Sequence, residues 1–90
     1  MPDMSTPIRA HVAVVIGKHL RRARAKAKIT QARLASRIGQ SSSTIAAYEA
    51  GAVTPPGDVL LRLTVALRLR LRPLLRAVAR RGHWRRRAAA

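Results

Sequence analysis

Residues 29–50 have the sequence ITQARLASRIGQSSSTIAAYEA, which contains two short amphipathic segments separated by one glycine. Gly39 favours the left-handed backbone conformation that commonly ends a helix. Thr30 and Ser41 each precede one segment, and hydroxyl side chains at such positions accept hydrogen bonds from the first N–H groups of a helix. The stretch therefore predicts one helix over residues 31–38, a tight turn, and a second helix from the Ser41 cap to about Glu49. The inward-facing residues at helical spacing are Leu34, Ala35, Ile38, Ile45 and Tyr48.

The flanking sequence adds three further helices by the same apolar periodicity. One is expected from about Val12 to Lys26, with Ile16, Leu20, Ala23 and Ala27 on one face. The segment AVTPPG at 52–57 reads as a loop, because two adjacent prolines oppose helix. Helices over about 58–67 and 71–80 follow, separated by a weakly signalled break at 68–70 that contains no glycine. Their expected inward residues are Leu60, Leu63, Thr64 and Leu67 in the first helix, and Leu71, Leu74, Leu75 and Val78 in the second.

Length and composition bound the architecture. Ninety residues allow one small domain, and the absence of Phe leaves Leu, Ile, Val and Ala to build the core, which favours packed helices over a sheet. We expect an all-α, compact five-helix domain over residues 11–80, with the two-helix motif at about 31–50. Residues 1–10 read as a flexible N-terminal arm, and residues 81–90 as a basic C-terminal tail.

The charge balance indicates the class of partner. Nineteen Lys and Arg residues face three acidic residues, which gives a formal net charge of +16. A compact helical unit with so large a positive charge repels itself and attracts polyanions, and nucleic acid is the most common such partner.

Several other classes are disfavoured. The chain has no cysteine, and its three histidines are dispersed, so we expect no metal site and no cofactor. It has no paired carboxylates and no Ser-His-acid set, so we expect no enzyme. The apolar patch near the N-terminus is too short for a secretory signal, and no window approaches a membrane span.

The second helix of the motif has the features of a helix that reads duplex DNA. Ser41, Ser42, Ser43 and Thr44 place small donors and acceptors at its start, where unpaired N–H groups also favour a phosphate. Ala46 and Ala47 offer methyl contact, for example to a thymine methyl group. Three longer polar side chains lie near the starts of the two motif helices, where they could contact phosphates or base edges; these are Gln31, Arg33 and Gln40.

An ordered set of residues then matches a known pattern. The matching residues are Ile16, Gly17, Leu20, Arg21, Arg24, Thr30, Gln31, Leu34, Ala35, Gly39, Ser41, Thr44, Ile45, Glu49, Gly51, Pro55, Leu60, Leu61, Arg62, Leu63, Ala66, Leu67, Leu74 and Leu75. Through these matches, residues 16–75 resemble the Cro and phage-repressor type of helix-turn-helix domain, also called XRE-like. The resemblance covers about two thirds of the chain.

The resemblance implies a five-helix domain whose third helix enters the major groove, and dimers on two half-sites about one helical turn apart. It implies DNA contacts at Gln31, Ser42, Ser43 and Ala47, and an internal ion pair between Arg24 and Glu49. Two departures from the pattern stand out. Lys28 occupies a position that is commonly glycine, and Arg68 and Arg70 replace small or polar residues between the fourth and fifth helices.

The sequence thus favours a cytoplasmic, bacterial nucleoid-associated or phage-encoded regulator, most simply a repressor, that binds double-stranded DNA as a homodimer. One alternative is an antitoxin that uses the same fold to hold a toxin protein. A less favoured alternative is a membrane-surface protein, because residues 59–81 are basic and amphipathic, although Pro73 interrupts them.

Overall fold

The computed structural model describes residues 6–81 of the 90-residue chain and shows five α-helices with no strand in that part. The helices are α1 (Thr6–Ala27), α2 (Gln31–Ile38), α3 (Ser42–Glu49), α4 (Gly57–Leu67) and α5 (Leu71–Arg81). The predicted all-α, five-helix class is confirmed, and α2 and α3 have the predicted bounds.

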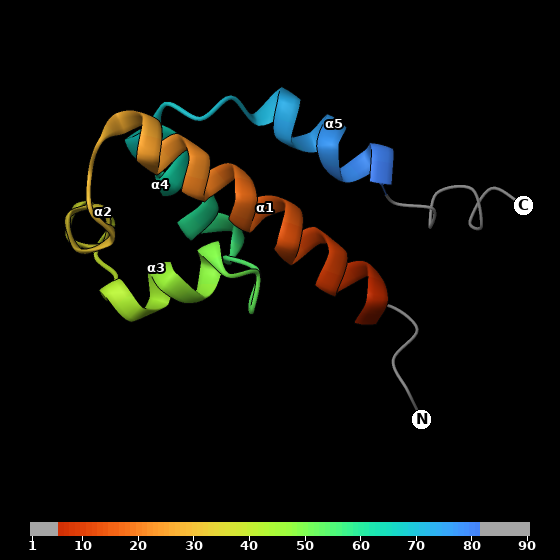
Figure 1. Ribbon diagram of the computed structural model, residues 1–90, viewed down its shortest axis with the longest axis horizontal. Coiled ribbons are helices and arrows are strands. Elements are labelled where there is room, and N and C mark those ends of the chain that lie inside the picture. The colour runs from red at the N-terminus through yellow and green to blue at the C-terminus, as the bar shows by residue number, and fades with distance from the viewer. Residues whose placement is uncertain (1–5, 82–90) are drawn as a thin grey trace, which may run out of the picture.

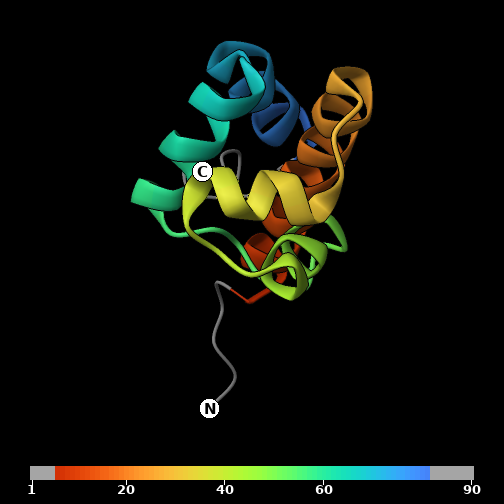
Figure 2. The ribbon, with the colours of Figure 1, turned by 90° about the vertical axis from the view of Figure 1, so that its left-hand side faces the viewer.

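The long helix α1 is the spine of the fold. It packs against α3, α4 and α5, while α2 packs against α3 and α4. Figure 1 shows α3 on one side of α1 and α5 on the other, with α2 seen end-on. Turned by 90°, the molecule presents α2 across its front, with α3 beneath it (Figure 2). The pair α2–α3 therefore forms one end of the molecule, away from α5.

The core is aliphatic, as the composition requires, and every helix contributes to it. The five largest fully buried side chains, one from each helix in order, are Leu20, Leu34, Ile45, Leu63 and Leu74. Tyr48 adds the one aromatic side chain to this buried cluster. Since no helix is covered on all sides, each keeps an outer face for charge or for contact with a partner.

Helix α1 is longer than the sequence indicated. It begins at Thr6, so residues 6–10, expected in the arm, form its first turns, and residues 1–5 lie outside the described part. Pro7 fits there because a proline in the first turn of a helix gives up no hydrogen bond. At the other end Ala27 is exposed rather than inward-facing. The physical reason is that α1 ends at this residue, where the chain turns toward α2.

Two non-glycine residues adopt the left-handed conformation at helix ends. Lys28 has φ 58° after α1, and Arg68 has φ 52° after α4. The N–H groups of Arg68 and Leu69 bond to the carbonyls of Val65 and Thr64, which closes α4 as a glycine would. The weakly signalled break at 68–70 is therefore a true helix boundary, and α4 and α5 do not merge.

The inward face of α5 is narrower than predicted. Leu74 is 1% exposed, but Leu71 and Leu75 are 41% and 59% exposed. The reason is that α5 packs mainly against α1, so only one line of its residues is covered. In α4, Leu63 and Leu67 are buried as predicted, and Val59, which the sequence had not assigned, is buried with them. The other two predicted inward residues, Leu60 and Thr64, are partly buried.

Candidate nucleic-acid interface

The turn between α2 and α3 is held by local hydrogen bonds. Thr30 is the N-cap of α2, and its hydroxyl accepts the N–H of Arg33 at 3.1 Å. Gly39 ends α2 with φ 71°. The N–H of Gln40 donates to the carbonyl of Ala35 at 2.8 Å. These contacts confirm the predicted caps and fix the direction in which α3 leaves α2.

The start of α3 is a small cluster of hydroxyl groups. Ser41 Oγ accepts the N–H of Thr44 at 3.2 Å and lies 3.1 Å from Ser43 Oγ and 2.8 Å from Thr44 Oγ1. The hydroxyl of Ser41 is therefore occupied mainly by the cap. Ser42 and Ser43 are exposed beside it, and the hydroxyl of Ser43 shares a hydrogen bond with that of Ser41. The tip of α3 is slim and polar, without a long side chain.

An ion pair lies behind this tip. Arg24 Nε donates to Glu49 Oε2 at 2.6 Å, and Arg24 Nη2 donates to Glu49 Oε1 at 3.0 Å. Arg24 Nη1 also donates to the carbonyl of Ile29 at 2.9 Å. The two side chains are only 19% and 5% exposed. The fork of the guanidinium thus joins α1 both to the last residue of α3 and to the segment that leads into α2.

The environment of the pair favours the charged arginine. The hydrogen bond to Glu49 raises the pKa of Arg24 above its ordinary value, burial opposes this effect, and the negative charge of Glu49 adds to it. A base whose pKa is raised on folding stabilises the folded state fully at any pH below its unfolded-state pKa. This stabilisation is lost only as the pH rises through the folded-state pKa. Arg24 therefore remains charged through the neutral and moderately alkaline range.

Gln31 joins the same network, which the sequence did not indicate. Its Nε2 donates to Glu49 Oε1 at 3.2 Å, so one carboxylate binds side chains from α1 and α2. The amide is half-buried and held in place at the first residue of α2. A side chain with a fixed orientation loses little freedom when it contacts a ligand.

Gly17 is a second feature that sequence reasoning did not assign. A Cβ atom at this position would clash with the carbonyl oxygen of Tyr48 and would lie 2.8 Å from that of Glu49. The backbone of α1 therefore approaches the C-terminal turn of α3 so closely that only glycine fits. A lone glycine inside a helical pattern was the available signal, because such a residue costs helix stability unless packing requires it.

The structure brings the predicted DNA-contacting residues to one end of the molecule, which faces the viewer in Figure 2. Arg33, Ser41, Ser42 and Ser43 are exposed, whereas Gln31, Gln40, Ala46 and Ala47 are half-buried. Arg24 and Glu49 lie behind them as an anchor.

The described part of the chain carries two acidic side chains, Glu49 and Asp58. Glu49 is neutralised by Arg24, and Asp58 lies in the first turn of α4, where the helix dipole favours a carboxylate. Exposed Arg33 and Arg37 on α2 therefore face solvent without an acidic partner among residues 6–81.

Other kinds of site find little support in residues 6–81. No group of three or more His, Asp or Glu side chains is placed to hold a metal ion there. Within the same residues, none of the helices combines the length and the apolar character needed to cross a bilayer. The stretch 59–81, considered above as a membrane-surface helix, is broken at Arg68, and its Val59, Leu63, Leu67 and Leu74 are buried in the core.

Comparison with known proteins agrees with this geometry. The family model described as "Helix-turn-helix domain" matches residues 15–78. A curated relative, Multiprotein-bridging factor 1 from Candida albicans, is 38% identical over 61 residues. This match covers 68% of the present chain but only 40% of the relative's length. No solved structure matches the chain significantly.

Proposed function

Because this chain belongs to the helix-turn-helix domain family, we propose that it is a transcriptional regulator of the Cro and phage-repressor type, which binds double-stranded DNA. One observation carries the proposal. The exposed, hydroxyl-tipped start of α3 is anchored by a turn, two caps and an ion pair, so that it projects in a fixed direction. A rigid, slim helix end within a basic molecule suits insertion into the major groove.

Each predicted contact residue has a role in this arrangement. Ser42 and Ser43 bond a phosphate or a base edge, while the methyl groups of Ala46 and Ala47 lie along the groove wall. At the start of α2, Gln31 and Arg33 bind the backbone, and Gln40 extends from the turn between the helices. Ser41 contributes through the cap that holds the helix end.

Short side chains limit direct reading of the bases. Ser and Ala cannot make the bidentate contacts of Arg, Asn or Gln, each of which discriminates by about 1–3 kcal/mol. We therefore propose that discrimination relies on Gln31, Gln40 and the shape of the duplex. The protein then regulates by occupying its site, most simply as a repressor.

The exposed leucines of α5 support a homodimer. Leu71 and Leu75 are one helical turn apart and are both exposed on the same helix. A second copy that covers them would form a twofold-symmetric dimer, the symmetry that matches the two half-sites of a palindrome.

The decisive experiment is selection of bound duplexes from a random pool with the full-length chain. Enrichment of a palindrome with half-sites about one turn apart is expected, and recovery of unrelated sequences would overturn specific binding. In titrations of the selected duplex, log K should fall against log salt with a slope near −5 if about six phosphates are neutralised. A slope near zero would contradict the electrostatic contribution.

A matched pair of variants locates the interface. Ser43→Glu places a negative charge at the tip of α3, where a carboxylate also suits the helix dipole, so folding should be retained. We expect binding to weaken by about tenfold or more, because the charge faces phosphates. Val65→Glu makes the same charge change on an exposed residue of α4 and should weaken binding much less. Equal effects of both variants would show that only net charge matters.

A further inference from the structure

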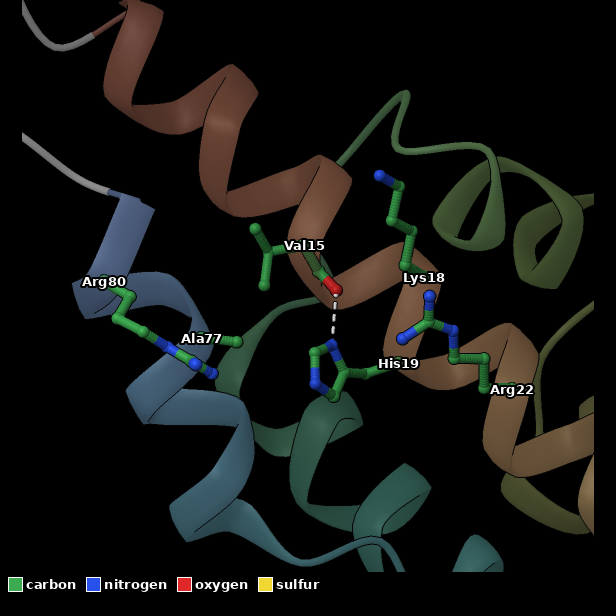
Figure 3. Close-up of a pocket in the computed structure, with 6 residues that line it drawn as sticks. All are labelled: Val15, Lys18, His19, Arg22, Ala77 and Arg80. Carbon is green, nitrogen blue, oxygen red and sulfur yellow. Dashed lines mark hydrogen bonds between the residues drawn. The ribbon is translucent and has the colours of Figure 1, made fainter.

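A second surface of the protein is a groove on the α5 side of α1. One pocket of about 310 Å³ lies between α1 and α5, and a second of about 740 Å³ lies between α1 and the α4–α5 junction. The two pockets adjoin at His19 and Arg22, which line both, and together they form the groove. Figure 3 shows the first pocket, with the His19 ring over it and Arg80 extending from α5 toward α1.

The rim of this groove is cationic. Lys18, Arg22 and Lys26 recur every four residues along α1, so their charges stack on one face of the helix. Arg68, Arg70 and Arg80 complete the rim from the opposite wall. Like charges one turn apart destabilise a helix, and neither Glu49 nor Asp58 lines the groove to relieve them.

The floor of the groove is apolar. Its accessible apolar surface comes from Ala23, Ala27, Leu69 and Ala77, while Val15 and Leu67 lie buried beneath them. His19 lies at the centre, where its Nδ1–H donates to the carbonyl of Val15 at 3.0 Å and so holds the ring in place. Its second nitrogen remains available to a ligand. The groove thus combines an apolar strip with a positive charge on both sides.

We propose that this groove binds an acidic amphipathic helix of a partner protein. The apolar face of such a helix would cover the floor, and its carboxylates would pair with the arginines and lysines of the rim. Residues 15–26 of α1 extend for about 16 Å, which matches about three turns of a docked helix.

Charge disfavours the other occupants at this rim. A second copy of this chain offers the rim only three acidic side chains, and residues 82–90 carry three arginines and no acid. The homodimer proposed above uses Leu71 and Leu75, which do not line the groove. A phosphate backbone would satisfy the rim but would leave the apolar floor uncovered. The groove and α3 also lie on different sides of α1 (Figure 1), so the partner and a duplex can bind together. The inference goes beyond the proposed function and does not depend on it.

The test uses the full-length chain and a fluorescein-labelled synthetic peptide of about 14 residues, with glutamates on one helical face and leucines on the other. Fluorescence anisotropy should show binding at least about tenfold tighter than for a scrambled peptide of the same composition or for oligoglutamate of the same charge. Equal binding of the three probes would mean that the floor plays no part, and would overturn the proposal.

Charge reversal locates the binding site. The double variant Lys18→Glu with Arg22→Glu removes two rim cations. It keeps one like-charge pair, between residues 18 and 22, and makes the pair between residue 22 and Lys26 favourable, so folding is expected to persist and is checked by circular dichroism. Peptide affinity should fall by about tenfold or more. The control, Arg37→Glu with Arg62→Glu, makes the same charge change on exposed residues outside the groove and should have a much smaller effect. An equal loss in the control would overturn the proposal.

Two further outcomes would also overturn it. If duplex DNA displaces the peptide competitively, the groove belongs to the nucleic-acid interface. If sedimentation shows a dimer of the unliganded chain that the Lys18→Glu, Arg22→Glu variant abolishes, the occupant is a second copy. Formation of a complex that contains chain, duplex and peptide together would support the proposal, while failure of DNA binding alone would leave the peptide result unaffected.

Discussion

Helices α3 and α5 flank the same helix, α1, but they are attached to it in different ways. On the α3 side the contacts are directional: Gly17 allows the backbones to meet, and Arg24 forms a forked ion pair with Glu49. On the α5 side the contacts are apolar: Leu74 is fully buried, and Ala77 and Val78 are partly buried against the core, beside a rim of cations. Directional contacts fix the orientation of a helix, whereas apolar contact mainly fixes its proximity. The α3 side is thus held in a fixed orientation, whereas the α5 side is held less directionally.

Removal of the ion pair should have the largest effect and should break the α3 side. In Glu49→Ala the guanidinium of Arg24 and the amide of Gln31 lose a shared partner, so we expect a loss of about 3–5 kcal/mol in unfolding free energy. For a domain this small, that loss removes much or all of its stability. Thermal melts followed by circular dichroism would measure it. Asp58→Ala, at an exposed acid in α4, should cost well under about 1 kcal/mol, and a melt of Glu49→Ala within a degree or so of wild type would rule out the anchor.

The packing of α5 against α1 should contribute to stability through Leu74 but not through the neighbouring Leu75. Leu74→Ala leaves a cavity against α1 and should cost about 3 kcal/mol in urea denaturation, whereas Leu75→Ala should stay within about 0.5 kcal/mol. If Leu75→Ala instead weakens a concentration-dependent dimer, sedimentation will show it, which would sharpen the assignment of this face to a second subunit. Equal losses of stability in the two variants would contradict the narrow inward face of α5.

Gly17→Ala tests the close approach of α1 to α3. The added methyl group meets backbone carbonyls that cannot rotate away, so the helices must separate at a cost of about 1–3 kcal/mol. In an open helix the same change would stabilise by about 1 kcal/mol, so the sign of the effect is decisive. Denaturant titration measures it. A more stable variant would show that the two backbones do not meet as described.

The smallest effects are expected at two helix junctions, the one between α1 and α2 and the one between α4 and α5. Lys28 leads from α1 to α2, and Arg68 leads from α4 to α5; both adopt a left-handed conformation that suits glycine better. We expect Lys28→Gly and Arg68→Gly each to stabilise the domain by about 0.5–1 kcal/mol, which raises the melting temperature by several degrees. A lower melting temperature for either variant would show that the replaced lysine or arginine side chain makes a contact whose stabilisation exceeds the strain of the left-handed backbone.

Much of the α2–α3 unit could be predicted from the sequence, because the residues that indicate it are close together in the chain. Thr30, Gly39 and Ser41 lie within a few residues of the helix ends that they cap, and helical spacing marks Leu34 and Ile38 as buried. The start of α1 was predicted too late in the chain. Pro7 was taken as a sign of a loop, but a proline also fits the first turn of a helix. The exposure of Leu75 was missed because periodicity reports an apolar face but not whether a neighbour covers it.

By itself, the sequence determined five helices, their caps and turns, an aliphatic core and a strongly basic surface, since all of these follow from neighbouring residues and composition. Only the tertiary structure decided that Gln31 shares the carboxylate of Glu49, that Gly17 meets α3, and that cations from α1, α5 and the α4–α5 junction surround one apolar groove. The physical reason is that each of these contacts joins residues far apart in the chain. Their proximity depends on how the helices pack, and no local propensity encodes it.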